Sequence, residues 1–156
     1  MIAIKPFLWF DTQAEAAAEF YITLFPNSRM IRIHRCGEAG PGPAGAVLLV
    51  EFELDGQRFL GLNGGPQFSF TEAISFTIEC DTQEEVDRYW ERLSAGGKEI
   101  ECGWLKDQFG LFWQVTPKAM GEFLGGANPA GRDRAMQAML KMKKLDIETL
   151  RKAYDG

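Results

Sequence analysis

The chain has 156 residues, of which 46% are hydrophobic and 25% are charged, and its formal net charge is -5. This length and balance predict one globular domain, residues 1–156, with its own core, and they exclude a disordered chain. The excess of acidic over basic residues repels phosphate backbones, so nucleic acid is not an expected partner.

The cysteine and histidine content indicates the cell compartment and limits the metal sites that the chain can form. The three cysteines are far apart and form no CxxC pair, which disfavours a zinc knuckle and indicates a reducing compartment. The single histidine, His34, excludes a His-rich zinc site within one chain and is expected at the surface. No signal peptide and no apolar run of roughly 18–20 residues are present, so we expect a cytoplasmic, soluble protein without a membrane partner.

Two segments of the chain, residues 4–21 and 74–91, resemble each other. Each is an apolar, β-rich run followed by Asp-Thr-Gln and a helix start. Thr12-x-x-Glu15 and Thr82-x-x-Glu85 both have the spacing of a capping box, in which a hydroxyl and a carboxylate accept hydrogen bonds from free amides. The repetition indicates duplication of one structural unit.

The predicted elements follow the same order in both copies. The first copy predicts a helix over 12–25, ended by Pro26, and the second a helix over 82–95 with an apolar stripe. The stripe is formed by Val86, Tyr89, Trp90 and Leu93. The strands expected after these helices cover 29–35, 46–54, 57–62, 99–103, 104–108 and 111–116. Each copy is therefore β-α-β-β-β, which predicts an α+β fold of mostly antiparallel strands.

The domain divides into two modules and a tail. Residues 1–66 form the first βαβββ module, residues 67–127 the second, and residues 128–156 a helical tail. The tail predicts helices over 132–144 and 146–154. Its methionine-rich stripe indicates core packing, with a binding surface as the alternative. The stripe consists of Met136, Met139, Leu140 and Met142.

Two glycine-rich loops follow predicted strands. The segment GEAGPGPAG, residues 37–45, leads into a strand, and its prolines remove amides, so we expect a mobile loop and no phosphate site. Asn63-Gly64-Gly65-Pro66 is either a plain turn or the mouth of a cleft, where glycines let a ligand approach Asn63.

A second group of polar and aromatic residues lies on the last strands. Cys102, Trp104 and Lys106 share a strand side if no bulge intervenes at Gly103, and they are either structural or part of a cleft. Strand alternation predicts that Phe112 and Gln114 share one face and that Trp113 packs toward a helix. Gln114 is then a satisfied core amide or a ligand contact.

Several motifs match one known family over nearly the whole chain. They are Pro6-Phe7-Leu8-Trp9-Phe10-Asp11, Leu24-Phe25-Pro26-Asn27-Ser28, Leu62-Asn63-Gly64-Gly65-Pro66, Cys102-Gly103-Trp104-Leu105-Lys106-Asp107 and Trp113-Gln114. Together with the duplicated βαβββ pattern, they resemble the PhnB-like family, whose members often carry the name 3-demethylubiquinone-9 3-methyltransferase. This family is part of the vicinal oxygen chelate superfamily, also called the glyoxalase–bleomycin resistance–dioxygenase superfamily. The resemblance implies two βαβββ modules that each curl a sheet around a cleft.

The resemblance also implies where a metal would bind in metal-dependent relatives: on the first and fourth strands of each module. The first-strand positions, 4–7 and 74–77, carry no His, Asp, Glu or Cys, and the fourth-strand positions fall near Asn63 and Gln114. Neutral amides without charged companions are weak ligands for a divalent ion. A glycine-rich strand-to-helix turn for S-adenosylmethionine is also missing. We therefore expect no metal and no other cofactor.

These observations predict a metal-free protein of this superfamily that binds a small apolar or aromatic molecule in its cleft. The expected cleft residues are Trp9, Phe10, Asn63, Phe68, Cys102, Trp104, Lys106, Phe112 and Gln114. The alternatives are a lyase-like or dioxygenase-like enzyme, the methyltransferase of the family name, and a structural dimer module with a vestigial cleft; no catalytic residue is assigned. The expected partners are a small-molecule ligand and a second copy in a homodimer, as the resemblance implies.

Overall fold

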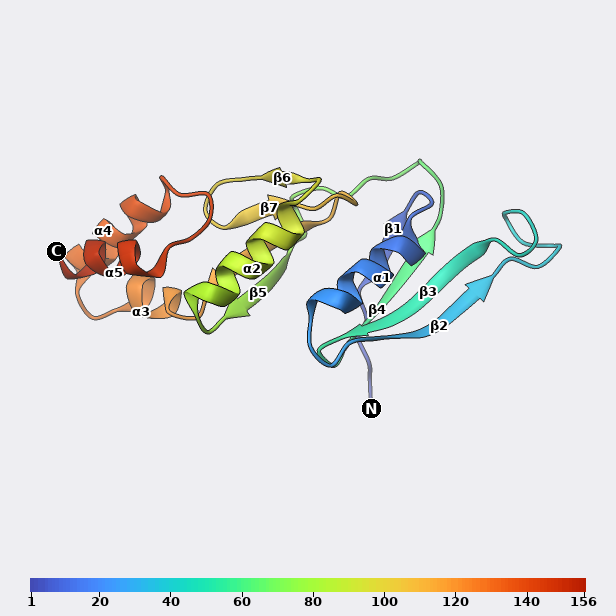
Figure 1. The fold of residues 1–156 in the computed structure, drawn as a ribbon, viewed down its shortest axis with the longest axis horizontal. Helices are drawn as coiled ribbons and strands as arrows, with labels where there is room; N and C mark the ends of the chain where they lie inside the picture. Colours follow the sequence, from blue (N-terminus) through green and yellow to red (C-terminus); the bar gives the residue numbers. More distant parts are fainter. The chain divides into compact units, whose positions relative to one another are not determined.

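The computed structural model describes residues 1–156, which form two compact units, Met1–Phe70 and Thr71–Gly156. Each unit contains a four-stranded mixed sheet with a helix packed on one face (Figure 1). The elements follow the order β-α-β-β-β in both units. The α+β class and the duplicated βαβββ pattern predicted from the sequence are therefore confirmed.

The first unit is built on a sheet with the strand order β1-β4-β3-β2. Its elements are β1 (Phe7–Phe10), α1 (Ala14–Leu24), β2 (Arg29–Arg35), β3 (Val47–Leu54) and β4 (Gln57–Asn63). Strand β1 runs parallel to β4, and the other pairs are antiparallel. Val50, Phe52 and Leu54 alternate along β3 and are buried, because this face of the sheet is the one that α1 covers.

The second unit repeats the arrangement with the strand order β5-β8-β7-β6. Its elements are β5 (Phe76–Cys80), α2 (Gln83–Ser94), β6 (Lys98–Glu99), β7 (Trp104–Lys106) and β8 (Phe112–Pro117). The four buried residues of α2 are the predicted apolar stripe, Val86, Tyr89, Trp90 and Leu93.

The strand expected over residues 99–103 is wrong, because β6 ends at Glu99. Cys102 and Gly103 have φ values of 60° and 82°, which no regular strand adopts. Their amides donate hydrogen bonds to the carbonyls of Met142 and Lys143, at 2.8 and 2.7 Å. The C-terminal segment thus takes over hydrogen bonds that a longer β6 would have made within the sheet.

The two predicted capping boxes have different outcomes. At α2, Thr82 Oγ1 accepts a hydrogen bond from the Glu85 amide at 3.2 Å, and the Glu85 carboxylate accepts one from the Asp81 amide at 2.7 Å. At α1, the helix begins at Ala14 after Gln13, and no side chain of the predicted box caps it. The prediction of a capping box at Thr12 is therefore wrong.

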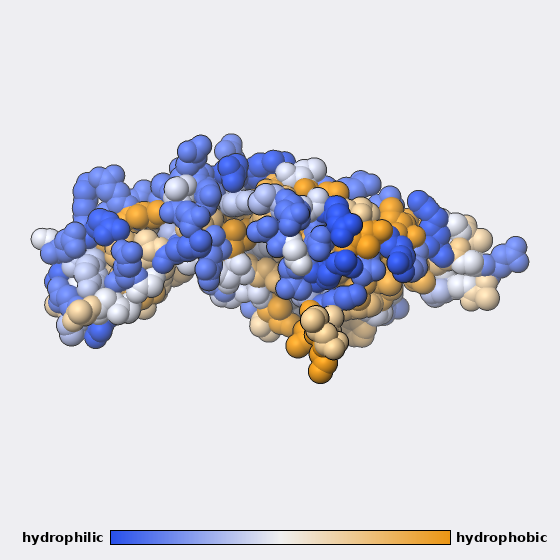
Figure 2. Space-filling view, turned by 90° about the horizontal axis from the view of Figure 1, so that it is seen from below, coloured by the Kyte–Doolittle hydropathy of each residue, from blue (hydrophilic) through white to orange (hydrophobic).

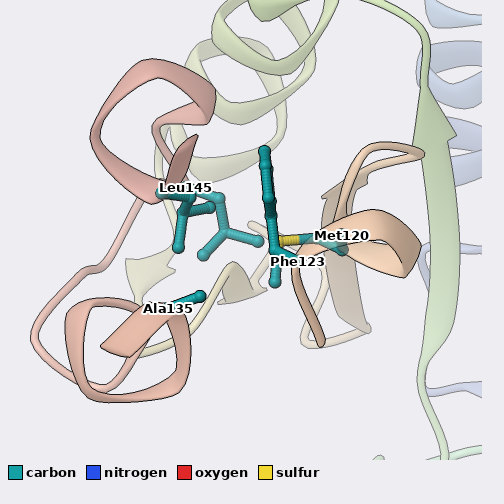
Figure 3. Close-up of a cluster of buried hydrophobic side chains, with 5 residues drawn as sticks. Met120, Phe123, Ala135 and Leu145 are labelled. Atoms are coloured by element: carbon teal, nitrogen blue, oxygen red, sulfur yellow. The ribbon is translucent and has the colours of Figure 1, made fainter. Parts of the chain in front are cut away.

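The second unit ends in three helices with their own apolar cluster. They are α3 (Met120–Gly125), which the sequence did not predict, α4 (Pro129–Met139) and α5 (Ile147–Asp155). The cluster, whose side chains point toward one another in Figure 3, consists of Met120, Phe123, Ala135, Leu145 and Leu150. Met139 and Met142 pack against it, whereas 39% of Met136 and 60% of Leu140 are exposed. The predicted core role therefore holds only for Met139 and Met142, which are partly buried, and not for Met136 and Leu140.

The surface carries separate groups of exposed apolar residues between hydrophilic ones (Figure 2). The large apolar side chains among them include Ile2, Ile4, Phe7, Phe68, Ile74 and Leu140. None of the helices has the length and apolar character needed to cross a membrane.

Candidate functional site

A cavity of about 670 Å³ lies in the first unit, where β1 and β4 end and β3 begins. Its walls come from the ends of these strands, the start of α1 and the loop between β2 and β3. The apolar lining residues are Trp9, Cys36, Pro41, Pro43, Ala46, Val47, Leu48 and Leu62. The polar lining residues are Asp11, Thr12, Glu15 and Asn63. The cavity therefore has an apolar body and a polar edge near the start of α1.

The indole of Trp9 forms a fixed wall of the cavity. Its Nε1 donates a hydrogen bond to the Gly65 carbonyl at 2.9 Å. The ring lies so close to Gly64 that a Cβ at this position would clash with it, and Phe68 packs against the ring edge-on at 4.9 Å between centroids. Gly64 therefore makes room for Trp9, and Gly65 has a φ of 97°, a backbone conformation that side chains rarely allow.

Asn63 lines the cavity, but its side chain is already bonded within the protein. The Oδ1 atom accepts a hydrogen bond from the Ala14 amide at 2.8 Å, and Nδ2 donates one to the Val47 carbonyl at 3.1 Å. Asn63 thus satisfies the first free amide of α1 and joins the end of β4 to the start of β3.

The loop between β2 and β3 closes the cavity on another side. The Cys36 amide donates to the Ala46 carbonyl at 2.7 Å, and the Gly45 amide donates to the Cys36 carbonyl at 2.8 Å. These bonds extend the β2–β3 pair by one step, so the loop returns directly into a strand and presents no helix N-terminus. Cys36, at the start of this loop, is 7% exposed.

The predicted cleft residues of the first unit fall into two groups. Trp9 and Asn63 line the cavity, and Phe68 packs on Trp9 while 65% of its own surface stays exposed. Phe10 is 3% exposed and packs edge-on against Phe70, at 5.2 Å between centroids. It occupies the helix-covered face and belongs to the core of the unit.

The other predicted cleft residues belong to the second unit, and four of them share one face of its sheet. The register pairs Trp104 with Gln114 and Lys106 with Phe112, while Trp113 pairs with Leu105 on the opposite face. Lys106 Nζ lies 5.8 Å from the centre of the Phe112 ring, and Gln114 Nε2 donates to Ser75 Oγ at 2.9 Å.

Cys102 lies outside this strand face. It occupies the turn before β7, and its Sγ lies 3.7 Å from the Met139 carbonyl oxygen. The Gly103 bend considered in the sequence is therefore present, and it separates Cys102 from Trp104 and Lys106.

Asp107 is a buried carboxylate with a structural role that the sequence did not reveal. It is 3% exposed, and Oδ1 accepts hydrogen bonds from the amides of Phe109 and Leu111 at 2.8 and 3.0 Å. Its Oδ2 accepts one from Trp113 Nε1 at 2.8 Å. Three donors thus hold the turn between β7 and β8.

The residues present do not fit the divalent metal of the superfamily's metal-dependent members. No group of three or more His, Cys, Asp or Glu side chains is placed to hold an ion. At the fourth-strand positions, the Asn63 oxygen already accepts the Ala14 amide, and Gln114 is a neutral amide bonded to Ser75. Neutral oxygens without charged companions bind such ions weakly.

The cavity residues that sequence reasoning missed lie at the start of α1 and in the β2–β3 loop. The sequence pattern places Asp11, Thr12 and Glu15 at a helix start and predicts a mobile loop over residues 37–45, and the structure places residues of both segments in the cavity wall. One available signal was the apolar Cys36 and Val47 on both sides of this loop, since flanking apolar residues favour a packed loop.

Comparison with known proteins identifies the family. The model of the 3-demethylubiquinone-9 3-methyltransferase family matches residues 2–116. The structure of a PhnB protein from Bacillus cereus, described with the same enzyme name, is 36% identical, with a TM-score of 0.68 over 73% of this chain and 98% of that one.

More distant structures share the fold. Protein PA1353 from Pseudomonas aeruginosa is 18% identical, with a TM-score of 0.63 over 75% of this chain and 98% of that one. The fosfomycin resistance protein FosX from Listeria monocytogenes is 18% identical, with a TM-score of 0.57 over 81% and 99%. A comparison with curated proteins gave no match. The family match and the Bacillus cereus relative together show that this chain belongs to the PhnB-like, 3-demethylubiquinone-9 3-methyltransferase family, with a fold related to FosX.

Proposed function

We propose that the cavity of the first unit binds a small apolar or aromatic molecule and does so without a metal ion. The observation that carries this proposal is the cavity of about 670 Å³ with apolar walls and a few polar groups. Sites for small molecules typically enclose roughly 300–1,000 Å³ with this composition. The internal bonds of Trp9 and Asn63 support the proposal further, because a wall held in place needs no ordering when the ligand enters.

The test is an NMR titration of the full chain with 4-phenyl-1-butanol, an aromatic probe with one hydroxyl group. The Trp9 indole N–H and the Ala14 amide, which is bonded to Asn63, report on two residues that line the cavity. Both resonances should shift and saturate with the same dissociation constant.

A matched pair of substitutions in the loop checks the location. Ala46 lines the cavity and is exposed, so Ala46→Trp fills the space without disturbing the core. Ala44 is exposed in the same loop but does not line the cavity, which makes Ala44→Trp the control. We expect loss of binding in the first variant only. Equal binding by both variants, or no saturable shift in the wild type, would refute the proposal.

Methyl transfer, the activity in the family's description, lacks a recognisable cofactor site in this chain. The β1–α1 and β5–α2 connections, residues 11–13 and 81–82, contain no glycine. A nucleotide-type cofactor needs a glycine-rich turn there so that the backbone can approach it closely. Calorimetry with S-adenosylmethionine should therefore show no binding, and micromolar affinity at one site per chain would support the named activity instead.

We also propose that the protein forms a homodimer. Exposed apolar side chains, among them Phe7, Met136 and Leu140, support it, because a two-fold contact commonly buries such surface. Light scattering at micromolar concentration should give twice the chain mass of 17.5 kDa. A monomer mass would contradict the proposal.

A further inference from the structure

The charge at the cavity is unbalanced. Asp11 and Glu15 line it, whereas no Lys, Arg or His does. Neither carboxylate forms an ion pair. On β3, by contrast, Glu51 contacts Lys5 and Arg58, and Glu53 contacts Arg29 and Arg58. The acidic side chains of this unit that line the cavity are thus left without a counter-charge.

Helix capping does not account for these carboxylates. Acidic residues often occupy a helix start because they cap free amides or oppose the helix dipole. At α1 no side chain of the flanking residues caps the helix, and the Ala14 amide is bonded to Asn63. Asp11 precedes the first helical residue by three positions, where the dipole field has less effect than within the first turn, whereas Glu15 lies in that turn and opposes the dipole. The dipole therefore accounts in part for Glu15 but not for Asp11.

We propose, as an extension of the function proposed above, that the molecule bound in this cavity is a cation: a small amine with an apolar or aromatic body. Its body would pack against Leu62 and Val47, and its ammonium group would lie toward Asp11 and Glu15. Trp9 lines the same cavity, and an indole ring attracts a cation placed over its face. A carboxylate ligand of the same shape is repelled by both acidic side chains.

Three probes of nearly equal shape separate charge from apolar contact: 4-phenylbutylamine, 4-phenyl-1-butanol and 4-phenylbutyrate. In the NMR titration described above, the amine should bind about tenfold more tightly than the alcohol, the gain expected from two partly exposed charge pairs. The butyrate should bind most weakly. Raising the salt concentration from about 50 mM to about 500 mM should reduce the difference between the amine and the alcohol, because salt screens exposed charges.

Substitutions on α1 test whether the preference arises at this site. Glu15→Gln, which keeps the size of the side chain, should remove most of the preference for the amine, because it lowers the affinity for the amine much more than the affinity for the alcohol. Glu19→Gln is the control, because Glu19 is exposed on the same helix and does not line the cavity. The control should behave as the wild type.

The outcomes distinguish this inference from the proposed function. If the alcohol binds at the cavity as tightly as the amine, the cation preference is refuted and the apolar site stands. If the butyrate binds most tightly, the cation preference is also refuted. If the two glutamine variants behave alike, the assignment of this preference to the cavity carboxylates is refuted. If no probe binds, the proposed function itself fails.

Discussion

Replacing Asp107 with asparagine should destabilise the second unit strongly although the two side chains are almost equal in size. The carboxylate is 3% exposed and accepts three hydrogen bonds, two from amides in the turn and one from Trp113 Nε1. The amide of an asparagine has one acceptor oxygen and one donor nitrogen. If its oxygen stays with the two backbone amides, its NH2 group faces the indole N–H at a distance that was 2.8 Å in the wild type.

The size of the effect follows from these contacts. A hydrogen bond to a charged group contributes about 1.5–3 kcal/mol and a neutral one about 0.5–1.5 kcal/mol, so the two weakened bonds cost about 2 kcal/mol. An indole N–H that loses its acceptor in the interior adds about 1–3 kcal/mol. The smaller cost of burying a neutral group offsets part of this loss. We expect a net decrease of about 2–4 kcal/mol in the free energy of unfolding.

Urea unfolding followed by far-UV circular dichroism measures this decrease, and a second substitution tests its cause. Trp113→Phe removes the indole donor, so Asp107→Asn should cost less in that background, by about 1–2 kcal/mol. Equal costs in the two backgrounds would show that the Trp113 contact does not matter. A cost below about 0.5 kcal/mol in the wild type would refute the assigned role of Asp107 altogether.

Three further predictions concern backbone packing, thiol reactivity and acid stability. Gly97→Ala should lower the free energy of unfolding, measured in urea, by about 1–3 kcal/mol, because the new Cβ would collide with the Lys106 carbonyl. Gly121→Ala in α3 is the control: its Cβ meets no atom, and it should raise the free energy of unfolding by up to about 1 kcal/mol. Burial raises the pKa of the Cys80 thiol to about 11, so this thiol should react slowly with iodoacetamide at pH 8. Mass spectrometry should find the half-buried Cys102 labelled first, and early labelling of Cys80 would contradict its burial. The hydrogen bonds from Thr149 lower the pKa of Asp146, so this N-cap stabilises the fold above the ordinary carboxyl pKa of about 4 and loses its effect as the pH falls below it. In acid titrations, Asp146→Asn should therefore make the decrease in stability with falling pH smaller. An unchanged profile would contradict the prediction.

The elements predicted correctly from the sequence are those whose signal is local. The strand expected over 29–35 is β2, and the apolar stripe of α2 is buried as its helical spacing predicted. The faces of β8 also follow from simple alternation, which places Gln114 with Phe112 and apart from Trp113.

The errors arise where a residue far away in the sequence replaces a local partner. Thr12 has the spacing of a helix cap but does not cap α1, and the first amide of the helix is bonded by Asn63, 49 positions from Ala14. In the segment 99–103, expected as a strand, the amides of Cys102 and Gly103 donate to the carbonyls of Met142 and Lys143. The sequence predicted only Trp9 and Asn63 of the cavity side chains for the same reason, since the cavity walls come from three segments that only the fold brings together.

The hydrogen bonds between the C-terminal segment and the turn before β7 show that residues outside the family match contribute to the second sheet. The family match ends at residue 116, and the Bacillus cereus relative is covered almost completely by 73% of this chain. A length variant confined to the matched residues would lack the acceptors of the Cys102 and Gly103 amides, and the Leu145 side chain packed on Gly103. The segment between α4 and α5 therefore stabilises the turn before β7 in the second sheet, and a shorter homologue needs other residues for this purpose.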